Sequence, residues 1–488
     1  MNMILFAHSY FLRFDPKQWE TGLPYPPLGT LYAASLLRHH NHHVALFDSM
    51  FAKQPEEVLP YLDNLQPQFF VIYDDGFNYL TKMCLTNMRE AAFRMCKMAS
   101  ERGCTVIVSG SDATDHYEKY INEGADFVIL GEAELTLLDL VTAIKNKSND
   151  FYSIQGIVFR ENNAIVKTAK RNVLKDLDSL PFPAWDLVDI SPYRESWLKH
   201  AGYFSLNMAT TRGCPFKCNW CAKPIYGNRY HSRSPQNVVE ELKLLKQKFK
   251  FDHIWFCDDI FGLKPGWVQE FADLVGKEKL HFKFRIQCRA DLLLQENYIH
   301  ALARAGCENA WIGAESGSQK ILDAMDKGIT IDQIHNATKF LKKYGIKPSF
   351  FIQFGYPGET KEDIQKTIRM INNLLPYELG ISVSYPLPGT VFFERVKAEL
   401  QEKANWTDSD ELKLMFRNTF QPAFYKQLHR YVHKIYRQHI AWENIKKILR
   451  HPFTVTPSII KKAASIIYYI PAAFFARQKL NAIENNSL

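Results

Sequence analysis

The sequence TTRGCPFKCNWC, residues 210–221, decides the fold. It follows the apolar segment Ser205–Thr210, which predicts a buried β-strand. Its three cysteines are Cys214, Cys218 and Cys221. Thiolates at this spacing converge on one soft metal centre, either zinc or an iron–sulfur cluster, unless all three are inert. Zinc needs a fourth ligand, and His231 is the only histidine nearby in the sequence.

A series of strands alternating with amphipathic helices continues from this segment. VVEELKLLKQKF, residues 238–249, has apolar residues at helical spacing. The predicted strands are Ser205–Thr210, His253–Cys257, Phe282–Gln287, Ala310–Ala314, Ser349–Phe354 and Gly380–Ser384. Six such units predict a partial (β/α)6 barrel of the TIM type, with catalysis at the carboxyl ends of the strands.

The chain before this series has a similar alternation. The predicted strands are Met3–Ala7, Val44–Asp48, Phe69–Tyr73, Thr105–Ser109 and Phe127–Leu130, with helices at Pro27–His39 and near Asn87–Arg102. This pattern is typical of a doubly wound, Rossmann-like sheet that binds a ligand at its strand ends. No GxGxxG follows the first strand, so the dinucleotide fingerprint is missing.

The sequence therefore predicts an α/β protein with four regions. Residues 1–145 form the Rossmann-like domain, and residues 146–200 form a connector with a small hairpin turning at Asn162-Asn163. Residues 201–395 form the partial barrel. Residues 396–488 form a helical and basic C-terminal region.

The charge of the chain is concentrated in the C-terminal region. The 488 residues are 46% hydrophobic, which excludes a disordered protein, and carry a net charge of +8. Residues 421–488 contain eleven Lys or Arg against two Glu, a net charge of +9, so the remainder carries −1. A basic groove across the body is therefore not expected, and nucleic acid is not a predicted partner.

The cysteines and apolar runs indicate where the protein works. Nine cysteines in a long chain with no secretory segment predict a reducing cytoplasm. No uninterrupted apolar run reaches the ~20 residues of a spanning helix. In the C-terminal region, Lys and Arg stand beside Ile, Tyr and Phe, which is typical of an interfacial helix on an anionic membrane. A helical cap packed on the barrel is the other interpretation.

The cysteine motif, CxxxCxxC with aromatic Trp220 before its last cysteine, resembles the signature of the radical S-adenosylmethionine (SAM) superfamily. The resemblance covers residues 201–395. It implies a 4Fe-4S cluster held by Cys214, Cys218 and Cys221, with the open iron chelated by SAM. An electron from the cluster then cleaves SAM to methionine and a 5′-deoxyadenosyl radical. The resemblance also implies an electron donor such as flavodoxin or ferredoxin.

Further segments resemble those that the family uses around SAM. In WFCDDIFG, Asp258 or Asp259 is assigned to SAM positioning, because cobalamin-dependent members have a similar FxDDxF segment; a helix N-cap is the alternative. Other predicted SAM contacts are Arg289, Gly313, Glu315, Ser316 and, in a motif similar to the family's adenine motif, Gly355. Taken singly, Arg289 and Glu315 could equally form surface ion pairs.

The N-terminal domain resembles the cobalamin-binding domain of the cobalamin-dependent class, through GLPYPPLGTLYAASLLR, VIVSGSDAT and VILGEAE. The resemblance implies cobalamin across the strand ends. Candidate contacts are Tyr10, Asp74, Ser109, Gly110 and Gly131. The DxHxxG motif that supplies a histidine ligand to cobalt is absent, which leaves the lower axial position to Tyr10, Asp74, Asp75 or water. A domain that has lost its cofactor is the alternative.

These features together predict a cobalamin-dependent radical SAM methyltransferase acting on an unactivated carbon of a small-molecule or lipid-like substrate. Residues 405–430 resemble a segment of the anaerobic magnesium-protoporphyrin monomethyl ester cyclases that is expected to close over the substrate. Radical oxidation or cyclisation without methyl transfer is therefore the second hypothesis. A non-catalytic protein that binds cobalamin and SAM is the third.

Overall fold

The computed structural model describes residues 3–400 and 405–485. The chain divides into two compact units. Among the described residues, the first unit comprises 3–216, 222–286 and 405–411, and the second comprises 217–221, 287–400 and 412–485. The predicted domain boundaries follow the expected cofactors rather than this division, and they stay predictions.

A seven-stranded sheet in the order β2-β1-β3-β4-β5-β6-β7 forms the core of the first unit. Its strands are β1 (Met3–Ala7), β2 (His43–Phe47), β3 (Phe69–Tyr73), β4 (Thr105–Ser109), β5 (Phe127–Ile129), β6 (Ile157–Glu161) and β7 (Ala164–Lys167). β1 to β5 are parallel, and the predicted hairpin of β6 and β7 extends them antiparallel. Because the strand order reverses between β1 and β3, a ligand-binding crevice is expected at their carboxyl ends.

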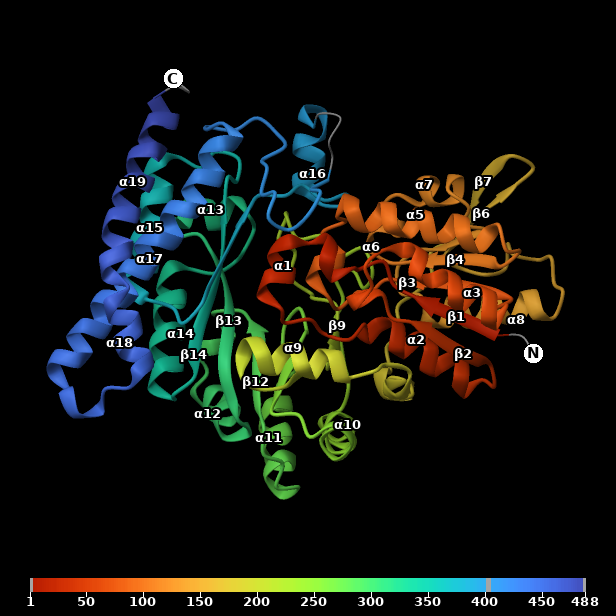
Figure 1. The fold of residues 1–488 in the computed structure, drawn as a ribbon, viewed down its shortest axis with the longest axis horizontal. Coiled ribbons are helices and arrows are strands. Elements are labelled where there is room, and N and C mark those ends of the chain that lie inside the picture. Colours follow the sequence, from red (N-terminus) through yellow and green to blue (C-terminus); the bar gives the residue numbers. More distant parts are fainter. Residues whose placement is uncertain (1–2, 401–404, 486–488) are drawn as a thin grey trace. The chain divides into compact units, whose positions relative to one another are not determined.

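Helices cover both faces of this sheet (Figure 1). They are α2 (Leu28–His39), α3 (Leu59–Leu65), α5 (Thr86–Ser100) and α8 (Glu134–Lys145). α3 and α5 share one core cluster with side chains of β1 and β3, while α2 and α8 contact each other on the other face. Every residue of β3 is buried, as expected for a parallel strand covered on both sides.

The second sheet has six strands in the order β15-β14-β13-β12-β11-β8. They are β8 (Ser205–Met208), β11 (His253–Phe256), β12 (Lys283–Cys288), β13 (Cys307–Glu315), β14 (Lys347–Phe354) and β15 (Leu379–Val383). The helices between them include α10 (Pro235–Phe249), α11 (Trp267–Lys277), α12 (Glu296–Ala305), α14 (Ile331–Lys343) and α15 (Lys361–Leu374). Spatial order equals chain order, as in a βα series, so the predicted α/β fold with a partial barrel is confirmed.

Shorter elements connect these parts. They are α1 (Pro16–Thr21), α4 (Tyr79–Lys82), α6 (Ser111–Asp115), α7 (Tyr117–Asn122), α9 (Ser191–Ala201), α13 (Gln319–Ala324), α16 (Val391–Val396) and the two-stranded sheet of β9 (Thr211–Arg212) and β10 (His231–Ser232).

The C-terminal region contains α17 (Pro422–Arg450), α18 (Pro457–Ala464) and α19 (Ile466–Asn485). In the second unit, α17 packs on α15 and β15, and α19 packs along α17 (Figure 1). The prediction of a helical region from about Leu400 is wrong for residues 405–421, which have no helix. Thr407 to Asp410 are turn formers, and the position before Pro422 disfavours helix; residues 401–404 lie outside the described part.

Candidate functional site

Within the described residues, the three predicted cluster ligands form no disulfide. Cys214 follows β9 in the first unit and is buried, while Cys218 and Cys221 belong to the second unit and are half-buried. Gly213 has φ +79°, and a side chain there would collide with the carbonyl of Arg229, so this bend needs glycine. In residues 3–400 and 405–485, no three His, Cys, Asp or Glu side chains are already gathered as a metal site. The donor set itself, three soft sulfurs, fits zinc or an iron–sulfur cluster.

Asn219, between the second and third cysteines, anchors the loop within the second unit. Its Nδ2 donates to the carbonyl of Ala324 at 2.7 Å and to Asp326 Oδ2 at 2.8 Å. Its Oδ1 accepts from the Tyr356 hydroxyl at 2.7 Å. Asn219 is buried, so these bonds fix the backbone that carries Cys218. Asn219 was not predicted as a site residue, because a variable position of a motif carries no signal of its own.

Asp258 follows β11 and holds the chain that leads to Cys214. Its Oδ1 accepts from the backbone N–H groups of Thr210 and Thr211 at 2.7 and 2.8 Å, and its Oδ2 accepts from the Thr210 hydroxyl at 2.6 Å. Burial raises the pKa of Asp258 to about 6 although these bonds favour the carboxylate. Asp259 is half-exposed and pairs with Lys82 at 2.8 Å. The role of either toward SAM stays a prediction, and Asp258 has a positioning role within the protein.

A buried ion pair lies at the carboxyl end of β13. Lys327 Nζ is 2.7 Å from Glu315 Oε1, and both side chains are under 10% exposed. Burial lowers the pKa of Lys327, but Glu315 outweighs this, so the pKa lies above its ordinary value. Gly313 makes room for the pair, because a Cβ there would lie 2.6 Å from Lys327 Nζ. Lys327 also lies over the ring of Trp220, 5.8 Å from its centre.

Arg289 braces the segment that carries Lys327. Its guanidinium donates to the carbonyls of Lys327 and Gly328 at 2.9 and 3.1 Å and pairs with Asp291 at 3.0 Å. Arg289 was predicted either to contact SAM or to form a surface ion pair. In the structure Arg289 is buried and forms an ion pair with Asp291. Residues 324–328 were not among the predicted site residues, although Asn219, Arg289 and Glu315 all bond to them.

Ser316 and Gly355 occupy neighbouring strand ends of the second unit. Ser316 is buried, and its hydroxyl lies 3.2 Å from that of Thr367. Gly355 has φ +77°, and its N–H donates to Glu359 Oε2 at 2.7 Å. From the region after the barrel, Asn418 Nδ2 donates to the Gly355 carbonyl at 2.6 Å. The segment expected to close over the substrate therefore contacts the predicted adenine motif.

The switch point of the first unit carries unpartnered polar groups. Among the described residues, the Tyr10 hydroxyl after β1 and the Ser111 hydroxyl after β4 are buried without a hydrogen-bond partner. Asp74 after β3 accepts from the Ser9 N–H and hydroxyl at 2.6 and 2.8 Å, and burial raises its pKa to about 6. Unsatisfied buried hydroxyls are costly, so a polar ligand at this edge is a physical reason for them.

Two glycines keep the same edge free of side chains. Gly110 has φ +146°, and a Cβ there would lie 2.7 Å from Asp74 Cβ. Gly131 has φ +77°, and its N–H donates to Thr114 Oγ1 at 3.2 Å. The Ser109 carbonyl accepts from the Asp74 N–H at 2.9 Å. The structure thus brings Tyr10, Asp74, Ser109, Gly110 and Gly131 to neighbouring strand ends, where a cobalamin rich in amide groups fits the donor and acceptor groups.

Both flanks of the cysteine motif contact this edge within the first unit. Arg212, two residues before Cys214, forms buried ion pairs with Glu132 and with Glu134, the latter at 2.7 Å. After the motif, the Ile225 carbonyl would lie 3.4 Å from a Cβ at Gly131. Arg212 was not predicted as a site residue, although the two carboxylates in the segment VILGEAE could have indicated a buried cation.

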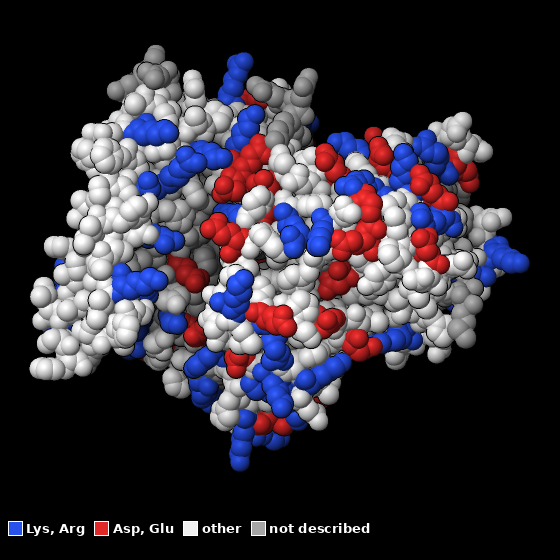
Figure 2. Space-filling model, viewed as in Figure 1, with Lys and Arg blue, Asp and Glu red and all other residues white. Residues whose placement is uncertain are grey.

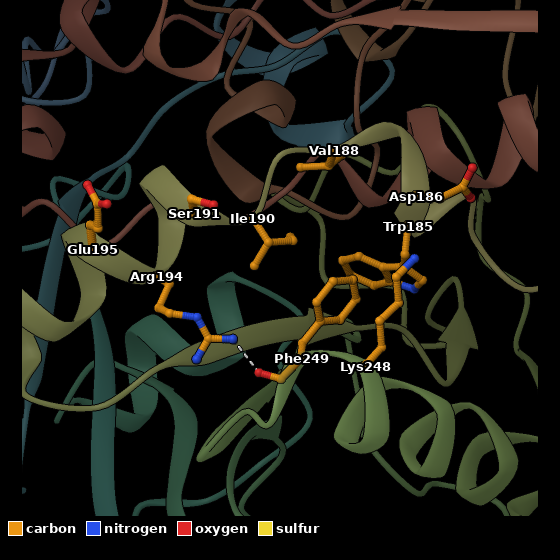
Figure 3. A pocket seen from close by; sticks show the side chains of 9 residues that line it. All are labelled: Trp185, Asp186, Val188, Ile190, Ser191, Arg194, Glu195, Lys248 and Phe249. Carbon is orange, nitrogen blue, oxygen red and sulfur yellow. Dashed lines mark hydrogen bonds between the residues drawn. The ribbon is translucent and has the colours of Figure 1, made fainter.

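A hollow of about 600 Å³ is lined by none of these residues (Figure 3). It lies between α10 and the connector, where Arg194 donates to the Phe249 carbonyl. Its lining includes Trp185, Asp186 and Lys248. Because it holds neither a predicted ligand nor an unpartnered hydroxyl of the first edge, we do not assign it to the chemistry.

Comparison with known proteins identifies the second β/α series. Residues 208–371 match the model of the Radical SAM superfamily. The chain carries a radical SAM domain. The superfamily uses a 4Fe-4S cluster and SAM, so the iron–sulfur interpretation of the thiols prevails over zinc, and the matched residues 208–371 indicate a radical SAM enzyme.

The relatives point the same way. An uncharacterized methyltransferase of Pyrococcus horikoshii is 28% identical over 78% of this chain and 81% of its own length. An anaerobic magnesium-protoporphyrin IX monomethyl ester cyclase of Synechocystis is 25% identical over 66% of this chain and 63% of its own length. The chain thus spans less than two thirds of that cyclase.

Two solved structures share the fold. The cobalamin-dependent SAM radical enzyme OxsB, with aqua-cobalamin and SAM bound, has a TM-score of 0.73 at 16% identity, over 97% of this chain and 72% of its own. The methyltransferase TsrM from Kitasatospora setae, with cobalamin and a [4Fe-4S] cluster bound, has a TM-score of 0.68 at 16% identity, over 82% and 75%. The predicted resemblance to cobalamin-binding radical SAM enzymes is confirmed, and the predicted cofactors are those of these structures.

Proposed function

We propose that this enzyme is a cobalamin-dependent radical SAM methyltransferase that methylates an unactivated carbon of a small-molecule or lipid-like substrate. The observation that carries the proposal is the contact of both flanks of the cysteine motif, Arg212 and Ile225, with the strand-end edge that carries Tyr10 and Gly131. The first unit therefore contains Cys214, both flanks of the cysteine motif and an edge suited to cobalamin.

Different residues would bind the cluster and position its ligands. Cys214, Cys218 and Cys221 would hold the cluster, and Asn219 and Asp258 keep their backbone in place. When bound, the cluster would supply the electron that cleaves SAM, and cobalamin would carry the methyl group.

Further contacts to the two small cofactors follow from the strand ends. Gly313, Glu315, Ser316 and Gly355 would contact SAM, with the Glu315 side chain held in position by its ion pair with Lys327. Tyr10 and Ser111 would donate their free hydroxyls to cobalamin.

The partners and location follow from the same chemistry. A reduced electron donor such as flavodoxin or ferredoxin must supply the electron, since none of the protein's own side chains does so. The nine cysteines form no disulfide among the described residues, which suits a reducing cytoplasm.

The test is an anaerobic reconstitution of the full chain with iron, sulfide and cobalamin, followed by SAM and a reductant. We expect 5′-deoxyadenosine and S-adenosylhomocysteine, and transfer of an isotopic label from the SAM methyl group to a hydrophobic acceptor. Absence of any SAM cleavage by a protein loaded with cluster would favour a non-catalytic binding protein.

The similarity to the magnesium-protoporphyrin cyclase supports a second candidate, radical oxidation or cyclisation. The same experiment separates the two. Product and 5′-deoxyadenosine without S-adenosylhomocysteine or label transfer would support the cyclase-like reaction and contradict the methyltransferase.

A further inference from the structure

The last two helices present an apolar surface that the fold leaves uncovered. Among the described residues, one helical stretch, Pro457–Glu484, is apolar and long enough to cross a membrane, although only 17% of its most apolar window is buried. This stretch was not predicted from the sequence, because lysines interrupt its apolar residues. The exposed apolar side chains are Ile460, Ile467, Tyr468, Ile470, Phe474 and Phe475, which we name the apolar face.

The opposite side of α19 is fixed to the protein. Ala473, Ala476 and Leu480 are buried, at the spacing of one helix face. The Ala476 carbonyl accepts from Gln427 Nε2 of α17 at 2.9 Å, and Glu484 pairs with Lys361 of α15 at 2.7 Å. These contacts within the second unit hold α19 along α17 by one side only.

Basic residues border the apolar face. At about 100° per residue, Ile467, Phe474 and Phe475 are centred opposite the buried alanines, and Arg477 and Lys479 fall on the two flanks between. Figure 2 shows the surface over α17 to α19 as mostly uncharged with scattered Lys and Arg. Glu484 is the only acidic residue of Pro457–Glu484, and Lys361 neutralises it.

We propose that the apolar face docks in the plane of an anionic lipid membrane. Aromatic and aliphatic side chains would enter the boundary between headgroups and acyl chains, while Arg477, Lys479 and the lysines of α18 contact anionic headgroups. The charge complementarity favours an anionic bilayer over a second copy of this face, because the basic residues of the two copies would repel each other. The one-sided packing on α17 selects an in-plane helix over a span.

Vesicle sedimentation of the full chain tests the proposal. With phosphatidylcholine vesicles containing anionic phosphatidylglycerol, we expect at least about tenfold stronger partition than with phosphatidylcholine alone. High salt should weaken binding, and alkaline carbonate should release the protein. A protein that resists carbonate would span the membrane, and one that stays in the supernatant with both vesicles does not dock; either result overturns the proposal.

Paired variants identify the face. Phe474→Ser/Phe475→Ser and Arg477→Glu/Lys479→Glu each change exposed side chains only, and each should reduce partition by about tenfold or more. Lys264→Glu/Lys277→Glu is the matched control, with the same charge change on exposed residues of the first unit, and should bind like the wild type. Equal loss in the control, or no loss in the face variants, contradicts the proposal.

Size-exclusion chromatography without lipid tests whether a second copy of the chain binds the apolar face. We expect Phe474→Ser/Phe475→Ser to leave the elution volume unchanged. A wild-type dimer that this variant splits would assign the apolar face to a second copy of the chain and overturn the proposal.

Discussion

The strand ends of the two units solve the problem of ligand binding differently. In the first unit, the edge around Tyr10 has glycines at positions 110 and 131. It also has buried hydroxyls that lack a hydrogen-bond partner. In the second unit, Glu315 and Arg289 are buried but already paired, with Lys327 and Asp291. The first edge thus offers free space and unpaired hydroxyls, whereas the second edge has charged side chains that ion pairs already hold in position.

This difference fits ligands of different size and charge. A large, uncharged ligand with many amides needs space and scattered hydrogen bonds, which the first edge offers. A small ligand with several charged groups, such as SAM, needs charges at fixed positions, because charges that do not move on binding give strong and specific contacts.

The largest effect is expected from the thiols themselves. Cys218→Ala should abolish the iron–sulfur absorbance and all SAM cleavage, because a cluster with two protein ligands is not retained. The measurement is iron and sulfide content with the visible spectrum after anaerobic reconstitution. Cys104→Ala, a free cysteine before β4, is the matched control and should keep the full spectrum. A Cys218→Ala protein with an unchanged spectrum would refute the cluster assignment.

The second largest effect is expected from the buried ion pair of Lys327 and Glu315. Lys327→Met leaves Glu315 buried without its cation, so we expect the free energy of unfolding to fall by ~3–5 kcal/mol. Urea unfolding followed by circular dichroism measures it. SAM affinity of the cluster-loaded protein should fall as well.

A double variant provides the control for this pair. Lys327→Met/Glu315→Gln removes both charges and should recover part of the lost stability, because no uncompensated charge remains. If the single and double variants are equally unstable, the pair is not coupled, and the comparison between the two edges loses its main support.

Much of this architecture is readable from the sequence, because it depends on local patterns. The strands of both sheets are buried apolar runs, and the positions of Cys214, Asp74 and Gly131 at strand ends follow from them. The residues that were missed act across long separations. Asn219 bonds to a residue 137 positions away, and Arg212 pairs with one 80 positions away, and no periodicity reports such contacts.

Contacts between distant residues also explain why the helix predicted after the barrel is absent at residues 405–421. Trp406 is fully buried, and its carbonyl accepts from the Thr86 N–H at 2.9 Å, so tertiary contacts fix this segment in an irregular conformation. The roles of Asp258 and Arg289 toward SAM depend on a ligand and stay predictions. Their bonds within the protein, by contrast, are visible only in three dimensions.

The third effect is a pH dependence at the first edge. Burial raises the pKa of Asp74 to about 6, above the value of ~3.9 for an unfolded chain. The stability that belongs to the protonated form is therefore complete below pH ~4 and is lost as the pH rises through 6. Asp74→Asn cannot ionise, so its stability relative to the wild type should improve by up to ~3 kcal/mol between pH 4 and 8.

Urea midpoints of both proteins across this pH range check the prediction. Asp63→Asn is the control, because Asp63 is exposed and pairs with Arg102 at the surface. Its difference from the wild type should stay nearly constant above pH 5. A constant difference for Asp74→Asn as well would show that Asp74 is not buried as an acid.

The smallest effect concerns the glycines that keep the first edge open. Gly131→Ala places a Cβ at φ +77° and 3.4 Å from the Ile225 carbonyl, whereas Gly103→Ala places one at φ +76° with nothing within 4 Å. Both variants pay the same backbone cost of ~1 kcal/mol, so any further loss in Gly131→Ala measures contact with the chain after the cysteine motif. We expect that further loss to be below ~1 kcal/mol by urea unfolding, with a larger relative loss in cobalamin binding by equilibrium dialysis. Equal cobalamin affinity in both variants would mean that the free space at Gly131 serves only the packing of Ile225.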